Sequence, residues 1–136
     1  MKLIAANAQP ASATAQNVIE LANDADPLLL SLDGVDRIDL CFPKFTDGRA
    51  FSQAFLLRRR QGFKGEIRAL GDVLVDQLAQ MERSGFDAAV LRADQDMSVA
   101  RRVLADYPGY GVGKYQGDAV DIRPHFGPHF VAAATA

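Results

Sequence analysis

Short apolar runs alternate with longer polar and glycine-containing segments along most of the chain. The runs at 18–21, 37–42, 66–70 and 87–91 have the length and apolar content of buried strands. Glycine, proline, asparagine and aspartate are frequent in the segments between these runs. The pattern therefore predicts four strands separated by loops and helices.

Three of the intervening segments have the period of amphipathic helices. In the segment 49–61, apolar side chains fall on one side of a helical wheel and most polar side chains fall opposite. A second helix is predicted over 73–84, with Asp72 at its cap, and a third follows Asp96 and ends before Pro108. The chain thus alternates between strand and helix.

The segment 28–32 is open to two interpretations. Asp26 followed by Pro27 is typical of a helix start, and Gly34 would stop that helix. The pair Asp33 and Gly34 between apolar runs is also typical of a hairpin, which would make the segment an antiparallel strand. The alternation elsewhere favours the helix, and the strand remains the alternative.

Turn residues recur at a fixed interval. Gly62 and Gly85 lie 23 residues apart, the same step leads on to Pro108, and Gly48 and Gly71 keep it ahead of two helices. A unit of this length holds one strand, one helix and two short loops. Successive βα units form a parallel sheet, so the predicted fold is α/β, either half-barrel-like or a small open three-layer sheet. A half-barrel leaves an uncovered apolar face, which predicts a homo-oligomer.

Composition sets limits on the partners. The 136 residues are 49% hydrophobic with a formal net charge of −2, which suits one ordinary domain. We expect a loosely ordered N-terminal arm at 1–17, a single α/β domain over 18–130 and a frayed end at 131–136. No apolar run approaches the roughly 20 residues that span a membrane, and mild acidity provides no general attraction for nucleic acid. Neither a membrane nor a nucleic acid is therefore expected as a partner.

Cysteine and histidine offer little for redox or metal chemistry. Cys41 is the single cysteine, which excludes an intrachain disulfide, and we expect an inert thiol on a buried strand. His125 and His129 have the spacing of two ligands on one helix, but Gly127 and Pro128 between them prevent that helix. The sequence contains no phosphate loop and no dinucleotide-binding glycine pattern. No metal and no cofactor are therefore expected.

Two polar side chains fall on the apolar sides of predicted helices. Arg58 projects among apolar residues of 49–61, and Gln77 does the same in 73–84. An unpaired buried charge is costly, so we expect Arg58 to reach solvent or to join a structural ion pair. The run 58–60 is typical of a solvated helix end, since its three arginines point in different directions.

Polar residues follow the predicted strands, where parallel α/β folds gather their ligands. Cations close to helix N-termini suit an oxyanion such as sulfate, sulfite, phosphate or a carboxylate. Three carboxylates there, Asp47, Asp72 and Asp76, are candidates for general acid–base catalysis. The alternative is that the aspartates cap helices and the arginines pair with them. The candidate ligand-binding residues are Lys44, Arg49, Ser52, Gln53, Arg68, Gln77 and Arg92.

Several segments resemble one bacterial family whose function is unknown. The matching segments include FPKFTDGR at 42–49, GEIRA at 65–69 and SGFD at 84–87, and the resemblance extends over about 18–92. The genes of that family commonly neighbour those of sulfite reductase and sulfate assimilation. Its members are often labelled oxidoreductases involved in sulfite reduction. That label comes from gene neighbourhood.

The resemblance implies a cytoplasmic accessory or binding protein of assimilatory sulfite and sulfate reduction, with sulfite reductase components as partners. A small enzyme using the same Asp and Arg residues is the alternative. This chain has Ser84 where members often carry a cysteine, and Phe55 where they tend to carry a basic residue. A mechanism that needs the thiol at position 84 is not open to this protein. If that position is only a helix C-terminus, Ser84 is a harmless exchange, which is the interpretation we favour.

Overall fold

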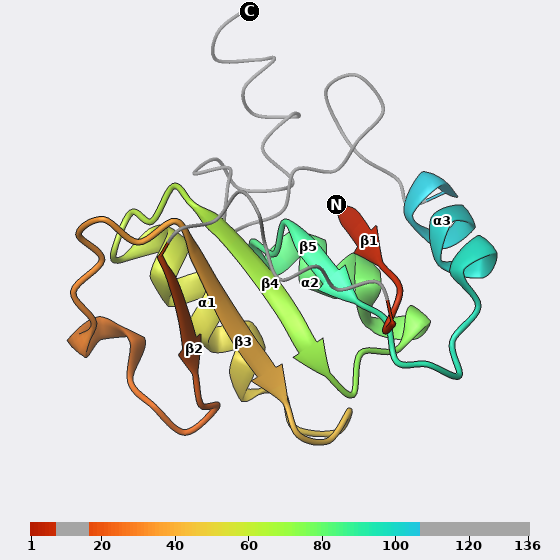
Figure 1. Cartoon of the computed structure of the whole chain (residues 1–136), viewed down its shortest axis with the longest axis horizontal. Helices are drawn as coiled ribbons and strands as arrows, with labels where there is room; N and C mark the ends of the chain where they lie inside the picture. The colour runs from red at the N-terminus through yellow and green to blue at the C-terminus, as the bar shows by residue number, and fades with distance from the viewer. Residues whose placement is uncertain (8–16, 107–136) are drawn as a thin grey trace, which may run out of the picture.

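The computed structural model describes residues 1–7 and 17–106, which form a parallel sheet covered by helices. The prediction of an α/β fold with a parallel sheet is confirmed. The strands are β1 (Lys2–Ile4), β2 (Val18–Leu21), β3 (Arg37–Phe42), β4 (Glu66–Gly71) and β5 (Ala88–Val90). They lie side by side in the order β1-β5-β4-β3-β2, and every neighbouring pair is parallel (Figure 1).

The helices follow the strands in regular alternation. α1 (Arg49–Arg59) follows β3, α2 (Leu78–Ser84) follows β4, and α3 (Met97–Asp106) follows β5. In Figure 1, α1 and α2 lie behind the sheet and α3 lies beside β1. β2 to β5 are neighbours in the order in which the chain makes them, whereas β1, the first strand, lies beside β5 at the edge of the sheet.

The main core lies between the sheet and these helices. Alternate residues of β3 (Ile38, Leu40 and Phe42) are fully buried, as are Leu57 of α1 and Met81 of α2. Successive side chains of a strand point to opposite faces, so this alternation identifies the helix-covered face. The apolar residues assigned to strands and helices from the sequence pattern supply most of this core.

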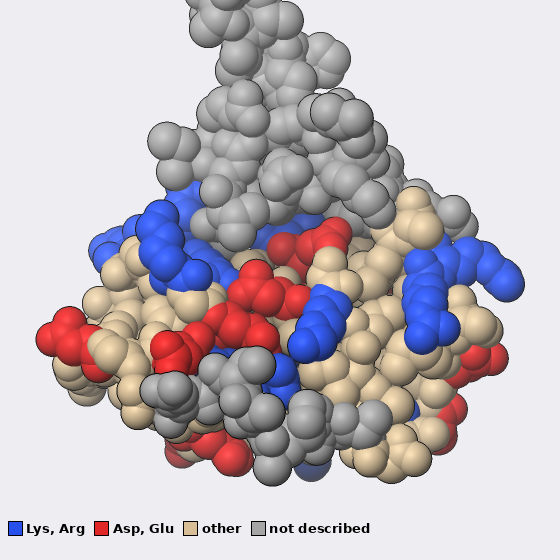
Figure 2. All heavy atoms as spheres, turned by 45° about the horizontal axis from the view of Figure 1, so that its top comes forward, with Lys and Arg blue, Asp and Glu red and all other residues tan. Residues whose placement is uncertain are grey.

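The opposite face of the sheet carries charges on its central strands. Arg37 and Asp39 are buried there and pair with each other, with Arg37 Nε 2.8 Å from Asp39 Oδ1. On β4, the buried Arg68 pairs with Glu66 at 2.7 Å. Figure 2 shows acidic side chains across the middle of the view with basic side chains beside them.

An apolar cluster on this second face lies towards the β1–β5 side of the sheet. Ile4, Ala88 and Val90 form a small cluster there, with Leu70 packed against it. The homo-oligomer was predicted from an uncovered apolar face. Since the centre of the face is charged, that argument is weaker than the sequence pattern suggested, and the oligomeric state stays a prediction.

The start of the chain differs from the expected loose arm. Residues Lys2–Ile4 form the edge strand β1 and pair in parallel with β5. The amide of Lys2 donates to the carbonyl of Asp87 at 2.7 Å, and the N-terminal ammonium of Met1 pairs with Glu82 at 3.0 Å. Three parts of the predicted layout lie outside the described residues: the rest of the arm at 8–16, the part of the domain after 106 and the C-terminal segment at 131–136.

The helix expected at 28–32 is reduced to one turn, a 3-10 helix at Pro27–Leu29. Asp26 caps it as predicted, because its carboxylate accepts a hydrogen bond from the Leu28 amide at 2.9 Å. Leu30 is already extended, so the helix does not reach Leu32. The alternative of an antiparallel strand is wrong, since this sheet contains only parallel pairs within the described residues.

The helix expected over 73–84 begins later than predicted. A 3-10 turn at Val75–Gln77 precedes α2, which starts at Leu78. Asp72 is therefore not its cap; the Asp72 amide donates to the Phe42 carbonyl at 2.8 Å and keeps the chain beside β3. The predicted stop at Gly85 is confirmed by its left-handed conformation, with φ of 108°.

Candidate functional site

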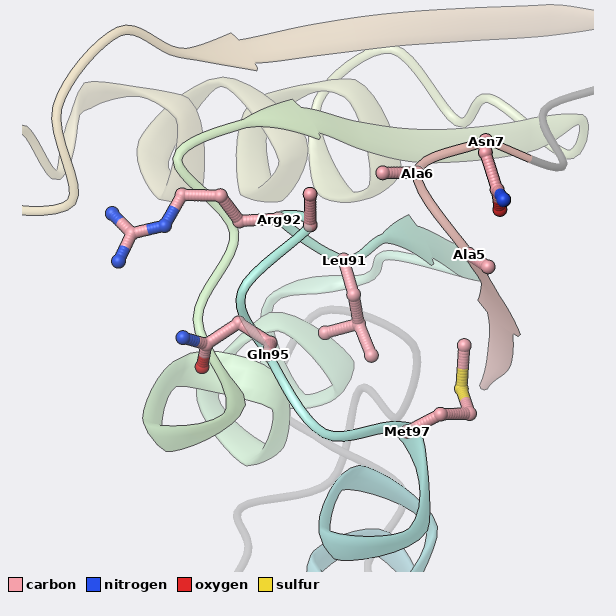
Figure 3. Close-up of a pocket in the computed structure, with 8 residues that line it drawn as sticks. Ala5, Ala6, Asn7, Leu91, Arg92, Gln95 and Met97 are labelled. Atoms are coloured by element: carbon pink, nitrogen blue, oxygen red, sulfur yellow. The ribbon is translucent and has the colours of Figure 1, made fainter.

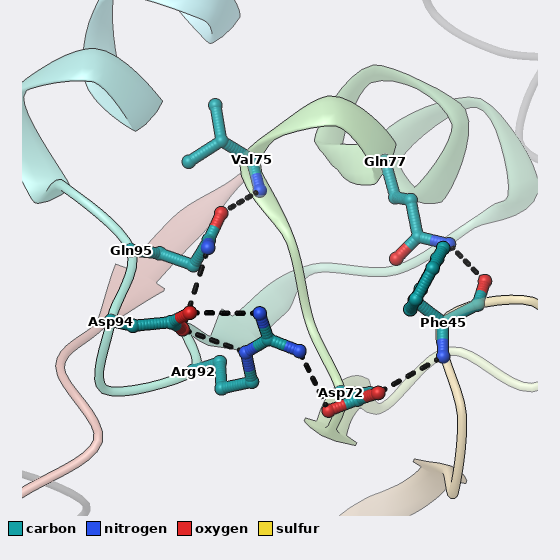
Figure 4. A network of polar contacts seen from close by, with 7 residues as sticks. All are labelled: Phe45, Asp72, Val75, Gln77, Arg92, Asp94 and Gln95. Carbon is teal, nitrogen blue, oxygen red and sulfur yellow. Dashed lines mark hydrogen bonds and ion pairs between the residues drawn. The ribbon is translucent and has the colours of Figure 1, made fainter.

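The loops after β3, β4 and β5 meet at the carboxyl edge of the sheet, and Asp72 joins them. Its Oδ2 accepts a hydrogen bond from the backbone amide of Phe45, at 3.2 Å, in the loop after β3. Its Oδ1 accepts a hydrogen bond from Arg92 Nη1, at 3.1 Å, in the loop after β5. Figure 4 shows this carboxylate between the two neighbouring loops. Two residues predicted for the site, Asp72 and Arg92, are thus brought together.

Arg92 is shared between two carboxylates. Its Nε and Nη2 donate to Asp94 at 2.6 and 2.8 Å, in addition to the bond to Asp72. Asp94 and then Asp72 raise the pKa of Arg92, and the hydrogen bond from Arg92 lowers the pKa of Asp94 to about 2. The guanidinium is therefore neutralised within the site, which leaves little positive charge for an external anion.

Two glutamines extend this network. Gln77 Nε2 donates to the Phe45 carbonyl at 2.7 Å, so both backbone polar groups of Phe45 are held by side chains of the segment after β4. Gln95 Oε1 accepts a hydrogen bond from the Val75 amide at 2.9 Å. Sequence reasoning missed Gln95 and Phe45, because no pattern marks a side chain that bonds to the backbone of another loop.

A second polar cluster surrounds Asp47. Its Oδ2 accepts from Asn23 Nδ2 at 2.6 Å and pairs with Arg49 Nη2 at 2.8 Å. The hydrogen bonds from Arg49 lower the pKa of Asp47 to about 2. The same Asp47 accepts a hydrogen bond from the Arg49 backbone amide at 3.1 Å, so the carboxylate supports the start of α1 while Gly48 occupies the N-cap position. The predicted alternative of capping and local pairing describes this cluster.

Three other predicted residues make no printed contact with the network around Asp72. Arg68 lies in β4 itself, buried on the second face of the sheet, and not in the loop that follows the strand. Gln53 is buried on α1, where its Nε2 donates to the carbonyls of Ala22 and Ala25 at 2.8 and 2.9 Å. This amide holds the loop after β2. Ser52 is exposed on α1.

Lys44 and Asp76 are exposed, and neither forms an ion pair with another residue of the described ranges. Cys41 lies on the predicted strand, but its side chain is less buried than expected. It is half-buried on β3 with its thiol donating to Glu20 Oε1 at 3.6 Å. Burial raises the pKa of the Cys41 thiol, and Glu20 raises it further. A raised thiol pKa leaves little reactive thiolate at neutral pH.

A cavity of about 230 Å³ opens beside this network, between the end of β1 and the start of α3. Leu91 and Met97 give it apolar walls, Ala5 and Ala6 supply small side chains, and Asn7 adds an amide. Figure 3 shows that the Arg92 guanidinium, although at the cavity, extends away from the other lining residues.

Within residues 1–7 and 17–106, no group of three or more His, Cys, Asp and Glu side chains is placed to hold a metal ion. His125 and His129 lie outside those ranges. Among the helices that the structure describes, none is long and apolar enough to cross a membrane.

Comparison with known proteins gives one match. A family model described as "Bacterial protein of unknown function (DUF934)" matches residues 18–126, which include β2 to β5 and all of the carboxyl-edge network. No curated protein and no solved structure matches the chain.

Proposed function

The chain belongs to this bacterial family of unknown function, and from that premise we propose that it is a cytoplasmic accessory or binding protein of assimilatory sulfite and sulfate reduction. It acts by contacting a protein, a sulfite reductase component, through the carboxyl-edge loops. The choice of pathway rests on the resemblance of 42–49, 65–69 and 84–87 to proteins whose genes neighbour those of sulfite reductase.

One observation favours a binding protein over an acid–base enzyme. The charged side chains at the carboxyl edge bond to one another, as in the chain from Asp72 through Arg92 to Asp94. A general base or acid works best with a pKa near the operating pH. The pKa values of Asp47 and Asp94, at about 2, are far from that range, and both carboxylates are held by arginines. Such a network supports a fixed loop conformation.

A small oxyanion is a weaker candidate for the ligand of this edge. Arg49 and Arg92 are each paired with carboxylates, and among the described cations that were predicted for the site only Lys44 lacks such a partner. The test is a thermal-shift titration with sulfite, sulfate and phosphate. A ligand at 100 times its Kd stabilises the folded protein by about 2.7 kcal/mol. A shift with sulfite or sulfate that Lys44→Gln removes would support this ligand.

The decisive experiment is purification of the protein from its host at native expression levels, with a tag on the chromosomal copy. We expect sulfite reductase subunits to co-purify in constant ratio to the tagged protein. The control is an Asp72→Asn chain, since loosening the edge network weakens a contact made there. Absence of these subunits under mild salt would overturn the proposal. So would substrate turnover by the purified chain that Asp72→Asn abolishes, because that is the behaviour of the alternative, a small oxidoreductase or acid–base enzyme.

A further inference from the structure

Phe45 is an exposed aromatic residue at an edge that is otherwise polar. Its exposed fraction is 49%, although it lies between the charged loops of the carboxyl edge. Single exposed apolar residues are common and need no explanation by themselves. What distinguishes Phe45 is the way in which its backbone and its neighbours are arranged.

Two side chains from the segment between β4 and α2 hold the backbone of Phe45. The Asp72 carboxylate accepts its amide hydrogen, and the Gln77 amide donates to its carbonyl. A turn also closes around it, because the Asp47 amide donates to the Lys44 carbonyl at 2.9 Å. Gln77 maintains its bond although its own Oε1 is buried without a hydrogen-bond partner. Figure 4 shows Gln77 and Asp72 on either side of Phe45.

A second exposed phenylalanine gives a useful contrast. Phe55 on α1 is 39% exposed, but the guanidinium of Arg59 lies over its ring, 5.4 Å from the centroid. Among the described residues, no ring contact and no cation–π contact involves Phe45. The backbone of Phe45 is therefore held by side chains, and about half of the residue, 49%, is exposed.

Lys44 adds a charge to this position. It is exposed, directly precedes Phe45, and forms no ion pair with another described residue. A half-exposed aromatic side chain on a held backbone, next to a cation that pairs with no described residue, suits an interface anchor. A preorganised backbone lowers the entropy lost on binding, and aromatic residues are enriched among the side chains that dominate binding energy.

We propose that Lys44 and Phe45 form a docking anchor for a protein partner that offers an apolar pocket bordered by carboxylates. The ring fills the pocket, and the ammonium group pairs with the carboxylates at its border. Asp72 and Gln77 are positioning residues, which hold the backbone of Phe45 by hydrogen bonds. The proposal rests on the proposed function for its expectation that the partner is a protein, and it adds the surface used and the chemistry of the partner's site.

Site-specific photo-crosslinking in the host tests the anchor. Phe45 is replaced by photoreactive benzoylphenylalanine in the tagged chain, and Phe55 is replaced in the same way as the matched control. We expect one adduct from position 45 and at least tenfold less of it from position 55. Mass spectrometry of the adduct then identifies the partner and the residues crosslinked, which are expected to be apolar with Asp or Glu beside them.

Charge reversal gives a second measurement. Lys44→Glu should reduce the adduct at least tenfold, and changing the partner's bordering carboxylates to lysine should restore it. Gln77→Leu should weaken the adduct without loss of the folded protein, as checked by circular dichroism. Equal adducts from both positions, no adduct from position 45, or a crosslink to a second copy of this chain would each overturn the anchor.

The two proposals fail in different ways. An adduct with a carboxylate-bordered apolar site on a protein outside sulfite reduction supports the anchor and overturns the proposed function. Co-purification of sulfite reductase together with equal crosslinking from positions 45 and 55 would instead support the proposed function and overturn the anchor.

Discussion

The guanidinium of Arg58, near the end of α1, donates a hydrogen bond to the carboxylate of Asp87, the residue just before β5. Only 8% of the Arg58 side chain is exposed, and it also donates to the backbone carbonyls of Phe63, Gly65 and Gly85, at 2.9, 2.7 and 3.0 Å. One side chain therefore ties together the loops that precede β4 and β5. Of the expected outcomes for Arg58, the structural ion pair is the one observed.

Arg58→Met should destabilise the fold strongly. The substitution keeps the apolar stem but leaves three backbone carbonyls without their donor. Breaking a buried ion pair costs about 3–5 kcal/mol, and we expect about 3 kcal/mol because Asp87 is half exposed. Urea denaturation measures the change. The control is Arg59→Met, on the exposed side of α1, for which we expect less than about 1 kcal/mol. Equal stability of the two variants would contradict the structural role of Arg58.

Gly71 and Gly62 form a second matched pair. Both have positive φ, 96° and 65°, but a Cβ at Gly71 would lie 2.4 Å from the carbonyl oxygen of Phe42, whereas nothing lies within 4 Å at Gly62. Gly62→Ala should cost about 1–2 kcal/mol for the left-handed backbone alone. Gly71→Ala should cost about 1–3 kcal/mol more, because the Phe42 strand must move. Thermal denaturation of both variants checks this, and a smaller effect at Gly71 would refute it.

Much of the fold follows from the sequence pattern because the strands are buried and the helices amphipathic. Phe42 and Leu57 are buried at the strand and helix positions that the apolar periodicity predicted, and the regular spacing of turns indicates the order of the βα units. β1 was missed, since three residues in an alanine-rich stretch form a strand only when β5 is beside them. The late start of α2 was also missed, because Asp72 bonds to other loops and does not cap that helix.

The candidate site was predicted only in part. The rule that ligands gather at strand ends placed Asp72 and Arg92 at the same edge, as the structure shows. It also included Arg68, which lies within β4 and not in the loop after it, because the strand continues to Gly71. Pairing of the arginines with the aspartates was the predicted alternative. The sequence did not indicate that Arg92 pairs with Asp72, because that contact depends on how the loops after β4 and β5 lie against each other.

Asp94 should make the folded protein less stable as the pH falls below about 4. Its pKa is about 2 in the folded protein, against an ordinary value of about 4 in an unfolded chain. Between these values the unfolded chain binds the additional proton, so the stabilisation is present above about pH 4 and is lost as the pH falls towards 2. Asp94→Asn should reduce this loss. Urea midpoints between pH 2 and 5 measure it for both proteins.

The matched control for Asp94 is Asp76→Asn, since Asp76 is exposed and pairs with no described residue. We expect its urea midpoints to follow those of the unchanged protein over the same pH range. Asp47→Asn should behave like Asp94→Asn, because Arg49 lowers the pKa of Asp47 to about 2 as well. If Asp94→Asn and Asp76→Asn were indistinguishable, the pairing of Asp94 with Arg92 would not persist in solution.

Cys41 should react slowly with alkylating reagents at neutral pH. Burial raises its pKa, and the Glu20 carboxylate that accepts its thiol hydrogen raises it further, so the reactive thiolate is scarce. We expect iodoacetamide to modify the folded protein more slowly at pH 8 than the same chain in urea. Glu20→Gln removes the negative charge and should increase the rate at pH 8. Rates are followed by intact mass, and the control is Glu66→Gln, a carboxylate bonded to Arg68 and not to the thiol. A rate that Glu20→Gln leaves unchanged would show that burial alone protects the thiol.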